Sequence, residues 1–329
     1  MTDVVIPWVN ANDPKWINKK MKWMIKHQNQ EQQQVMDSEE RYRDYGTLKY
    51  LLRSIDRNMS WVENIYLITD EQIPDWLDIE NDRVKIIDHA DYIDAENLPT
   101  FNSNAIELNI NKIKDLDEQV VLFNDDHIVN QMTKESDFFI DGKPTDFRVY
   151  EALVPQESFD HIIINNNMII NRLFYSNGKR RNLGAIINRK YGKFMVRSII
   201  ASYFRGVSGY YNAHGPQPLL KSSIDKLWSV AYEEAVETSS HHIRSEEDIN
   251  IWLARYLQLE NENFVPTSPN RSAFYEINQI NQINDDLRNR KHQLICINDT
   301  DTENYETLTL KLKSTLEQIF PDKCQFELK

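Results

Sequence analysis

Glycine is scarce in this chain, with only 8 among 329 residues. A Walker loop or a dinucleotide-binding turn needs several closely spaced glycines, because the backbone must come close to phosphate groups. No such glycine-rich run occurs, and neither does the strand–turn–helix motif that presents a nucleophilic serine in hydrolases. The sequence therefore argues against a P-loop NTPase and a Rossmann-type dehydrogenase.

Cysteines and long apolar runs are also few. The two cysteines, Cys296 and Cys324, form no disulfide framework, which favours a reducing cytosol. No stretch approaches the roughly 18 apolar residues of a membrane span. The sequence also does not open with the cationic segment and following apolar segment that are typical of a signal peptide. We expect a cytoplasmic protein, with at most a peripheral association at the inner face of the membrane.

Positive charge is in the minority. The chain has 38 Lys and Arg against 51 Asp and Glu, and its formal net charge is -13. This balance argues against nucleic acid as a partner and against adhesion to an anionic surface through the overall field. The hydrophobic content of 40% is ordinary for a globular protein.

The first part of the sequence alternates short apolar runs with amphipathic patterns. We predict strands over residues 3–9, 64–69, 83–87 and 120–123, and helices over residues 15–34, 46–58 and 103–113. This alternation predicts an α/β fold: a nucleotide-sugar-binding sheet, glycosyltransferase A-like or Rossmann-like, flanked by helices.

The later part is predicted to be mostly helical. Residues 159–174 and 194–204 are expected to be buried helices or strand–helix pieces. Residues 222–238 and 245–259 are expected to be amphipathic helices, the second opened by a capping box from Ser245 to Asp248. Residues 277–289 are polar and weakly patterned, residues 294–297 form a late strand, and residues 303–319 a final helix. The predicted organisation is one composite catalytic domain: an α/β part over 1–145, a helical insertion over 146–290, and a segment over 291–329 that rejoins the first sheet.

Acidic and amide side chains gather where the predicted strands end. Asn124-Asp125-Asp126 directly follows the apolar run over 120–123, and Asn298-Asp299 follows the late strand. Ligands bind at the carboxyl ends of strands in open α/β sheets. Neighbouring carboxylates repel each other unless a proton or a hard cation such as Mg²⁺ lies between them. Asn and Asp are also common in solvated turns, which is the alternative interpretation.

Two further residues suggest chemistry on phosphate. His214 lies in a loop flanked by Gly215 and Pro216, where a near-neutral side chain suits a general base, although a core histidine is the alternative. Arg244 precedes the expected capped helix, where it could face a diphosphate. Arg41 and other basic residues could also bind phosphate. The alternative interpretation is that they lie on a solvated surface or form local ion pairs.

Four blocks of the sequence resemble, in order, the Stealth family of sugar-phosphate transferases. The family includes bacterial capsule and exopolysaccharide phosphotransferases and the catalytic part of an animal lysosomal-enzyme N-acetylglucosamine-1-phosphotransferase. The blocks are residues 3–14, residues 41–55 continuing through 61–77, residues 98–107 through 122–126, and residues 241–248. The tail, residues 295–299 and 320–328, also resembles the end of the animal enzyme.

The resemblance implies transfer of a sugar 1-phosphate from a nucleotide diphosphate sugar, such as UDP-GlcNAc, to a hydroxyl of a glycan or lipid-linked glycan. The product is a phosphodiester, and a nucleoside monophosphate leaves. By position, the implied catalytic residues are Asp3, Asp125, Asp126, His214 and Arg244. The expected substrate-binding residues are Asn10, Arg41, Asp44, Asn102, Ser103 and Glu107. The expected ligands of Mg²⁺ (or Mn²⁺) are Asn124, Asp125, Asp126, Asn298 and Asp299.

Two other functions remain open from the sequence. An ordinary nucleotide-sugar glycosyltransferase would use the same acids and sheet but release a nucleoside diphosphate. A glycan- or protein-binding module that has lost activity would show no turnover and no dependence on metal.

Overall fold

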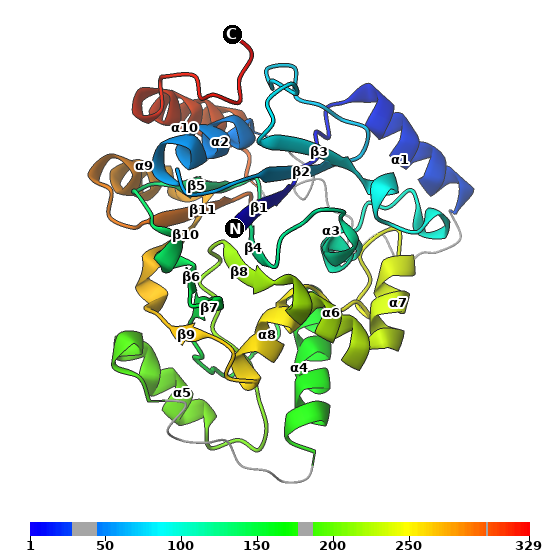
Figure 1. Cartoon of the computed structure of the whole chain (residues 1–329), viewed down its shortest axis with the longest axis vertical. Helices are drawn as coiled ribbons and strands as arrows, with labels where there is room; N and C mark the ends of the chain where they lie inside the picture. Colours follow the sequence, from blue (N-terminus) through cyan, green and yellow to red (C-terminus); the bar gives the residue numbers. More distant parts are fainter. Residues whose placement is uncertain (28–44, 177–186, 301) are drawn as a thin grey trace.

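The computed structural model describes residues 1–27, 45–176, 187–300 and 302–329. Its centre is a five-stranded sheet in the order β3-β2-β1-β4-β8 (Figure 1). The strands are β1 (Thr2–Pro7), β2 (Ile65–Thr69), β3 (Val84–Asp88), β4 (Gln119–Leu122) and β8 (Gln217–Leu220). The first four are parallel, and β8 closes the edge antiparallel to β4.

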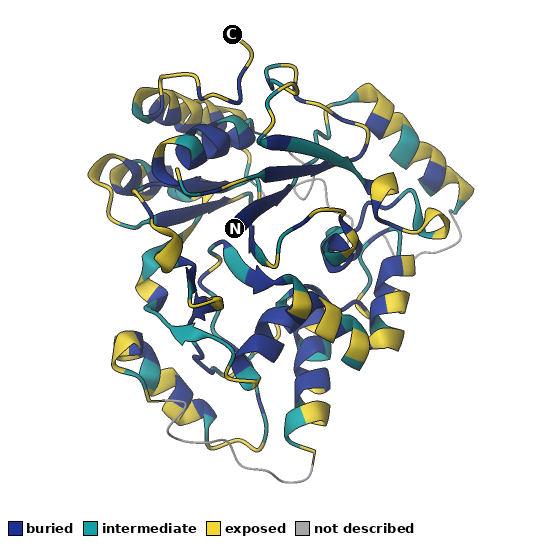
Figure 2. Cartoon of the chain, viewed as in Figure 1, coloured by how far each residue is buried: buried dark blue, intermediate teal, exposed yellow. Residues whose placement is uncertain are grey.

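Helices cover both faces of this sheet, which explains why β1 is apolar almost throughout. Alternate side chains of a strand point to opposite faces. Val4 and Ile6 pack on one side with α2 (Thr47–Asn58), while Val5 packs on the other with α8 (Trp252–Glu260). Figure 2 shows the buried strands between these helical layers. The predicted α/β class, with a sheet flanked by helices, is confirmed.

The remaining elements complete two smaller sheets and the outer helices. The smaller sheets are β10-β11-β5 (Ser272–Glu276, Leu294–Asn298, His127–Val129) and β6-β7-β9 (Phe139–Ile140, Lys143–Asp146, Val265–Pro266). The other helices are α1 (Pro14–Lys26), α3 (Ser103–Leu108), α4 (Asp160–Phe174), α5 (Met195–Ala201), α6 (Lys221–Val230), α7 (Tyr232–Ser240), α9 (Ile280–Asn289) and α10 (Tyr305–Ile319).

The late strand does not rejoin the five-stranded sheet, so that expectation was wrong. β11 lies in the second sheet, parallel to β10 and antiparallel to β5. β5 follows β4 after only a short turn, so its free edge gives β11 a partner from the first part of the chain. The C-terminal segment returns to that part, but at a different sheet.

Several predicted helix bounds also differ. α1 ends at Lys26, and the rest of the predicted helix over 15–34 lies outside the described residues. The helix predicted over 103–113 is a short α3 followed by a 3₁₀ turn at Ile110–Lys112. The helix predicted over 222–238 is divided into α6 and α7 at Ala231, whose backbone is not helical.

The capping box predicted at Ser245 does not open a helix, since α8 begins only at Trp252. The side chain of Asp248 is fully buried, and it accepts hydrogen bonds from the side chains of Asn102 and Asn104. These contacts across the chain outweigh the local helical signal. The polar residues before β11, in contrast, do form a regular helix, α9.

A buried ion pair joins α2 to the C-terminal tail. Arg53 and Glu327 meet through two hydrogen bonds of 2.7 and 3.1 Å, and their side chains are only 4% and 2% exposed. Burial by itself raises the pKa of Glu327, but hydrogen bonds from Arg53 and from the N–H of Cys324 outweigh it, so the pKa is lowered. The stabilisation is therefore present at neutral pH and is lost as the pH falls below the ordinary glutamate range.

We expect Glu327→Gln to lower the free energy of unfolding by about 3–5 kcal/mol, because Arg53 loses its buried charged partner and keeps, among the described residues, only the exposed Glu317, at 3.3 Å. Denaturant unfolding at pH 7 measures this change. Asp94→Asn, which breaks the exposed pair between Asp94 and Lys112, is the matched control and should have a small effect. Equal effects of the two variants would contradict the prediction.

Candidate active site

The acidic turn after β4 lies at the carboxyl end of the five-stranded sheet. Asn124 is exposed, and Asp125 and Asp126 are half-buried. The turn is held from the second sheet, because the N–H of Ile297 donates to the carbonyl of Asp126 at 3.0 Å. β11 therefore brings Asn298 and Asp299 to the same region of the molecule, as the sequence suggested.

Three carboxylates crowd around one buried hydroxyl. The pKa of Tyr45 is raised first by burial and then by the charges of Asp126, Asp299 and Asp125. Burial also raises the pKa of Asp126 to about 7, although the thiol of Cys296, 3.5 Å from its Oδ2, opposes this shift. The turn is thus an acidic site in which at least one carboxylate is poorly solvated.

His127 connects this turn to the loop of His214. The N–H of Asn124 donates to Nδ1 of His127 at 3.0 Å, so Nδ1 carries no proton. Nε2 then carries it and donates to the carbonyl of His214 at 3.1 Å. Burial lowers the pKa of His127 to about 3, so the ring stays neutral at physiological pH. Sequence reasoning missed His127, although its position beside the acid pair could have suggested it.

The loop of His214 has a backbone that few residues adopt. His214 itself has a φ of 49°, and its N–H donates to the side chain of Asn212 at 2.9 Å. At Gly215 a Cβ atom would lie 2.3 Å from the hydroxyl oxygen of Ser272, so any larger residue there would force the Ser272 side chain to move. The loop is therefore fixed between the acidic turn and β10.

The ring of His214 is exposed on one side and packed on others. It lies 4.4 Å from the ring of Phe274 and 5.9 Å from that of Trp252. This partial desolvation lowers its pKa below the ordinary value of 6.5. A neutral imidazole that solvent can reach is able to accept a proton from a bound hydroxyl group.

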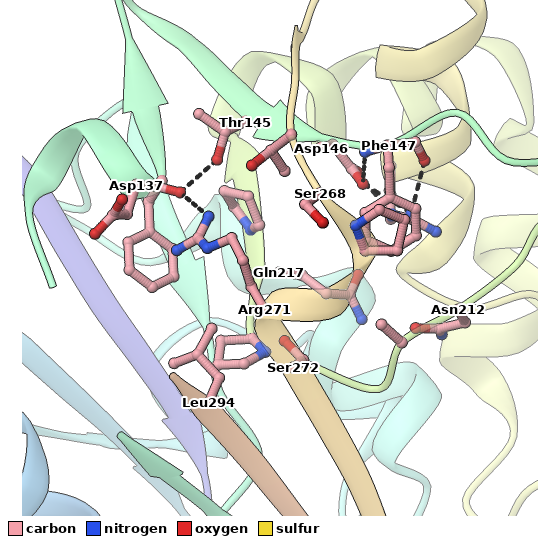
Figure 3. Close-up of a pocket in the computed structure, with 18 residues that line it drawn as sticks. Asp137, Thr145, Asp146, Phe147, Asn212, Gln217, Ser268, Arg271, Ser272 and Leu294 are labelled. Carbon is pink, nitrogen blue, oxygen red and sulfur yellow. Dashed lines mark hydrogen bonds and ion pairs between the residues drawn. The ribbon is translucent and has the colours of Figure 1, made fainter. Parts of the chain in front are cut away.

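A buried ion pair and the residues before His214 line the same small cavity. The cavity has a volume of about 50 Å³, and its lining includes Asn212, Asp146 and Arg255; Asn212 and Asp146 are labelled in Figure 3. Asp146 accepts two hydrogen bonds from Arg255, at 2.7 and 2.8 Å, and Arg271 donates to the carbonyl of Asp137 on the far wall. The cavity is too small to hold a nucleotide sugar.

A second group of predicted residues surrounds the start of α3. The guanidinium of Arg244 donates to the hydroxyl of Ser103, and Asn102 is fully buried and bonded to Asp248. Phe101 and Ile243 pack with Trp16 and with residues of the loop that follows β1. We call Arg244, Ser103, Asn102 and Glu107 the Arg244 group. The group therefore also lies at the carboxyl side of the sheet, next to the loop that follows β1.

Glu107 belongs to the Arg244 group and has an unusual pKa. Burial raises its pKa from 4.5 to about 7, and the charge of Arg244 only partly offsets this. A raised folded-state pKa means that the protonated form is favoured in the fold, so the stability from this group is lost as the pH rises from about 4.5 to 7.

We expect Glu107→Gln to flatten the pH dependence of the melting temperature in that window, since the amide stays neutral. Melting curves of both proteins, recorded across the window, measure the difference. Glu80→Gln, at an exposed residue, is the control and should follow the wild type. A Glu107→Gln curve parallel to the wild type would mean that Glu107 is charged in the fold.

The other predicted residues have different places. Asp3 is fully buried near the amino end of β1, where it accepts hydrogen bonds from Asn64 and from the N–H of Asp117, both at 2.9 Å. That is the opposite end of the sheet from Asp125, so its position fits a structural role. Asn10 follows the carboxyl end of β1, and its main chain is bonded to Gln72. Arg41 and Asp44 lie outside the described residues.

The donor atoms of the acidic turn suit a hard divalent cation. Oδ1 of Asp126 is buried and has no hydrogen-bond partner within the described ranges, which is what an absent positive ligand would leave. Asp126, His127 and Cys296 also offer ligand atoms within 4.8 Å of one another. However, both nitrogens of His127 are engaged, and burial raises the pKa of the Cys296 thiol far above its ordinary value. The carboxylates are therefore suitable ligands for Mg²⁺ or Mn²⁺. The group of Asp126, His127 and Cys296 is less suitable as a zinc site.

Comparison with known proteins identifies the family. Three family models match this chain: Stealth protein conserved region 1 over residues 3–28, conserved region 2 over residues 41–146, and conserved region 4 over residues 285–329. A capsular polysaccharide phosphotransferase, WcwK of Streptococcus pneumoniae, is 35% identical over 99% of this chain and 98% of its own length. The chain belongs to the Stealth family. This confirms the family expected from the sequence and, with it, an enzyme of the phosphotransferase class.

Other Stealth relatives match over nearly the whole chain. An exopolysaccharide phosphotransferase, cps2G of Lactiplantibacillus plantarum, is 38% identical over 99% of this chain and 96% of its own length. Among solved structures, a galactosyltransferase, LgtC, in complex with donor and acceptor sugar analogues, covers 95% of this chain and 96% of its own, at 10% identity and a TM-score of 0.40. That likeness is too remote to bear on the site of this Stealth protein.

Proposed function

We propose that this protein transfers a sugar 1-phosphate from a nucleotide diphosphate sugar, with UDP-GlcNAc as the first candidate, to a hydroxyl of an acceptor glycan in capsule or exopolysaccharide synthesis. The products are a phosphodiester and a nucleoside monophosphate. The single observation that carries the proposal is the bridge through His127, which holds the acidic turn and the loop of His214 next to each other. The names of the relatives, capsular and exopolysaccharide phosphotransferases, support it.

The acidic turn would hold the metal ion. Asp125 and Asp126 are the proposed ligands of Mg²⁺ or Mn²⁺, assisted by Asn124, Asn298 or Asp299. When bound, the ion would neutralise the diphosphate of the donor and relieve the repulsion among the carboxylates.

His214 and Arg244 would act on the acceptor and on the transferred phosphate. The neutral ring of His214, which has an exposed edge, takes the proton of the acceptor hydroxyl as the oxygen attacks phosphorus. Arg244, already orientated by Ser103, stabilises the negative charge on the transferred group. Ser103, Asn102 and Glu107 shape the pocket around it.

A groove beside the Arg244 group offers room for the rest of the substrates. It measures about 850 Å³ and is lined by one face of α1 and by Glu71, Glu96, Leu98, Pro99 and His242. Four lysines of α1, Lys15, Lys19, Lys22 and Lys26, outnumber the two glutamates in this lining, although Lys19 is paired with Asp70 and Glu71. This charge suits an anionic glycan or lipid-linked diphosphate acceptor, handled in the cytoplasm at the inner face of the membrane.

The decisive experiment identifies the nucleotide that the purified protein releases. The protein is mixed with Mg²⁺, a panel of nucleotide sugars and a glycan acceptor, and the nucleotide products are separated. Release of the monophosphate, with a phosphodiester signal in ³¹P NMR, is expected. Release of the diphosphate would assign ordinary glycosyl transfer instead, and donor binding without any turnover would favour a binding module.

A further inference from the structure

Helix α5 buries its small residues and exposes its large apolar residues, which is the reverse of an ordinary amphipathic helix. Its small residues Ser198 and Ala201 are fully buried, and the hydroxyl of Ser198 accepts a hydrogen bond from the N–H of Tyr150 at 2.9 Å. Its larger apolar residues point outwards. The sequence predicted a buried helix or a buried strand–helix piece over 194–204, and the predicted burial was wrong for the outer face. A surface helix normally buries its large apolar residues, so the outer face of α5 is a candidate for contact with another surface.

The outward residues form a compact apolar surface at the edge of the molecule. We call it the α5 patch, and it consists of Val196, Ile199, Ile200, Tyr203 and Phe204. Their exposed fractions are 58%, 56%, 63%, 91% and 51%, respectively. Figure 2 shows exposed residues along α5, which lies far from the five-stranded sheet. Single exposed apolar residues are normal, but five within nine positions mark an interaction surface.

The α5 patch lies in a basic stretch of the chain. Residues 187–207 contain five basic side chains and no acidic one, in a chain whose net charge is -13. The basic residues are Arg189, Lys190, Lys193, Arg197 and Arg205, and all five are exposed. Arg197 pairs with Glu151 and packs on Tyr211, so it also anchors the helix. The remaining cations flank the patch along the chain, and Lys190 also donates to the carbonyl of Pro266 at 2.9 Å.

We propose that the α5 patch binds an anionic lipid bilayer, with α5 lying in the plane of the interface. Helices that lie in this way combine apolar and aromatic residues on one side with Lys and Arg at the border. The apolar residues enter the acyl boundary while the basic residues meet anionic headgroups. A second copy of the same patch is a poorer occupant, because two surfaces of like charge repel. This inference does not depend on the proposed transfer reaction.

Vesicle flotation tests the proposal directly. The whole protein is mixed with vesicles of phosphatidylcholine alone, or of phosphatidylcholine with about one third phosphatidylglycerol. We expect binding only to the anionic vesicles, and weaker binding at high salt. The double variant Ile200→Ser with Tyr203→Ser should bind roughly tenfold or more weakly, because it loses two buried apolar groups. Lys190→Glu with Lys193→Glu should weaken binding by a similar factor.

A matched control uses an exposed apolar residue elsewhere. Leu310→Ser, on α10, removes a side chain that is 68% exposed and should bind vesicles like the wild type. Melting temperatures establish that all variants fold. The proposal is overturned if the wild type does not float with anionic vesicles, or if the patch variants float equally well. A dimer in sedimentation that the same variants dissociate would instead assign the patch to a second copy. No donor or acceptor is present, so a failure here leaves the transfer proposal unaffected.

Discussion

Replacing Asp126 by alanine is expected to abolish turnover while leaving the apo protein at least as stable as before. The activity should fall by roughly 10²–10³-fold or more, the range for removing one group that stabilises developing charge. In metal-free buffer the melting temperature should be unchanged or raised, because the variant removes a buried carboxylate whose Oδ1 has no hydrogen-bond partner in the described parts of the chain.

Added metal distinguishes this prediction from a general loss of function. Mg²⁺ at about 100 times its dissociation constant should stabilise the wild type by about 2.7 kcal/mol, and the variant by much less. Thermal melting with and without Mg²⁺ measures both proteins. Asp322→Ala, at an exposed acid, is the control and should respond like the wild type. A large destabilisation of the Asp126 variant without metal would mean that this carboxylate is structural.

The second large effect is expected at His214. Removing the proposed base should lower kcat by roughly 10²–10⁴-fold, while the affinity for the donor changes by no more than about twofold. Asparagine is the better replacement, since it tolerates the positive φ of this position and cannot serve as the base. Steady-state kinetics give kcat, and calorimetry with a non-reacting donor analogue gives the affinity.

The pH profile provides an independent readout for His214. Because partial desolvation lowers its pKa below 6.5, the wild type should keep its activity down to mildly acidic pH and lose it below that pKa. The residual activity of His214→Asn should lack this step. A variant that loses donor affinity but keeps kcat would show that His214 binds the donor and does not take the proton.

Patterns among neighbouring residues were sufficient to predict part of the fold. The buried strands and the acids that follow them could be predicted because a strand that is covered on both faces is apolar throughout. β8 was missed, since Gln217-Pro-Leu-Leu220 is short and contains a proline. The helix start at Ser245 was wrong because Asn102 and Asn104 bind Asp248 from more than 140 positions away.

The candidate site likewise contains residues that the sequence predicted and residues that it missed. The acids of the turn, His214 and Arg244 carry recognisable patterns, and the structure brings the acids and the His214 loop together. Cys296 carried no such pattern, and His127 had only its position beside the acid pair, because the roles of both residues come from contacts at 170 and 87 positions along the chain, respectively. Such contacts exist only once β5 and β11 have paired, and no periodicity in the sequence encodes that pairing.

The pairing of β5 with β11 also sets the order in which the enzyme is completed during synthesis. All five strands of the central sheet end by Leu220, so they are synthesised while the last hundred or so residues are still to be made, although α8, which covers one face, and the C-terminal tail, which packs on the other, come later. The acidic turn, however, is held by the N–H of Ile297. A nascent chain therefore contains every strand of the central sheet before it contains the strand β11, whose Ile297 holds the acidic turn.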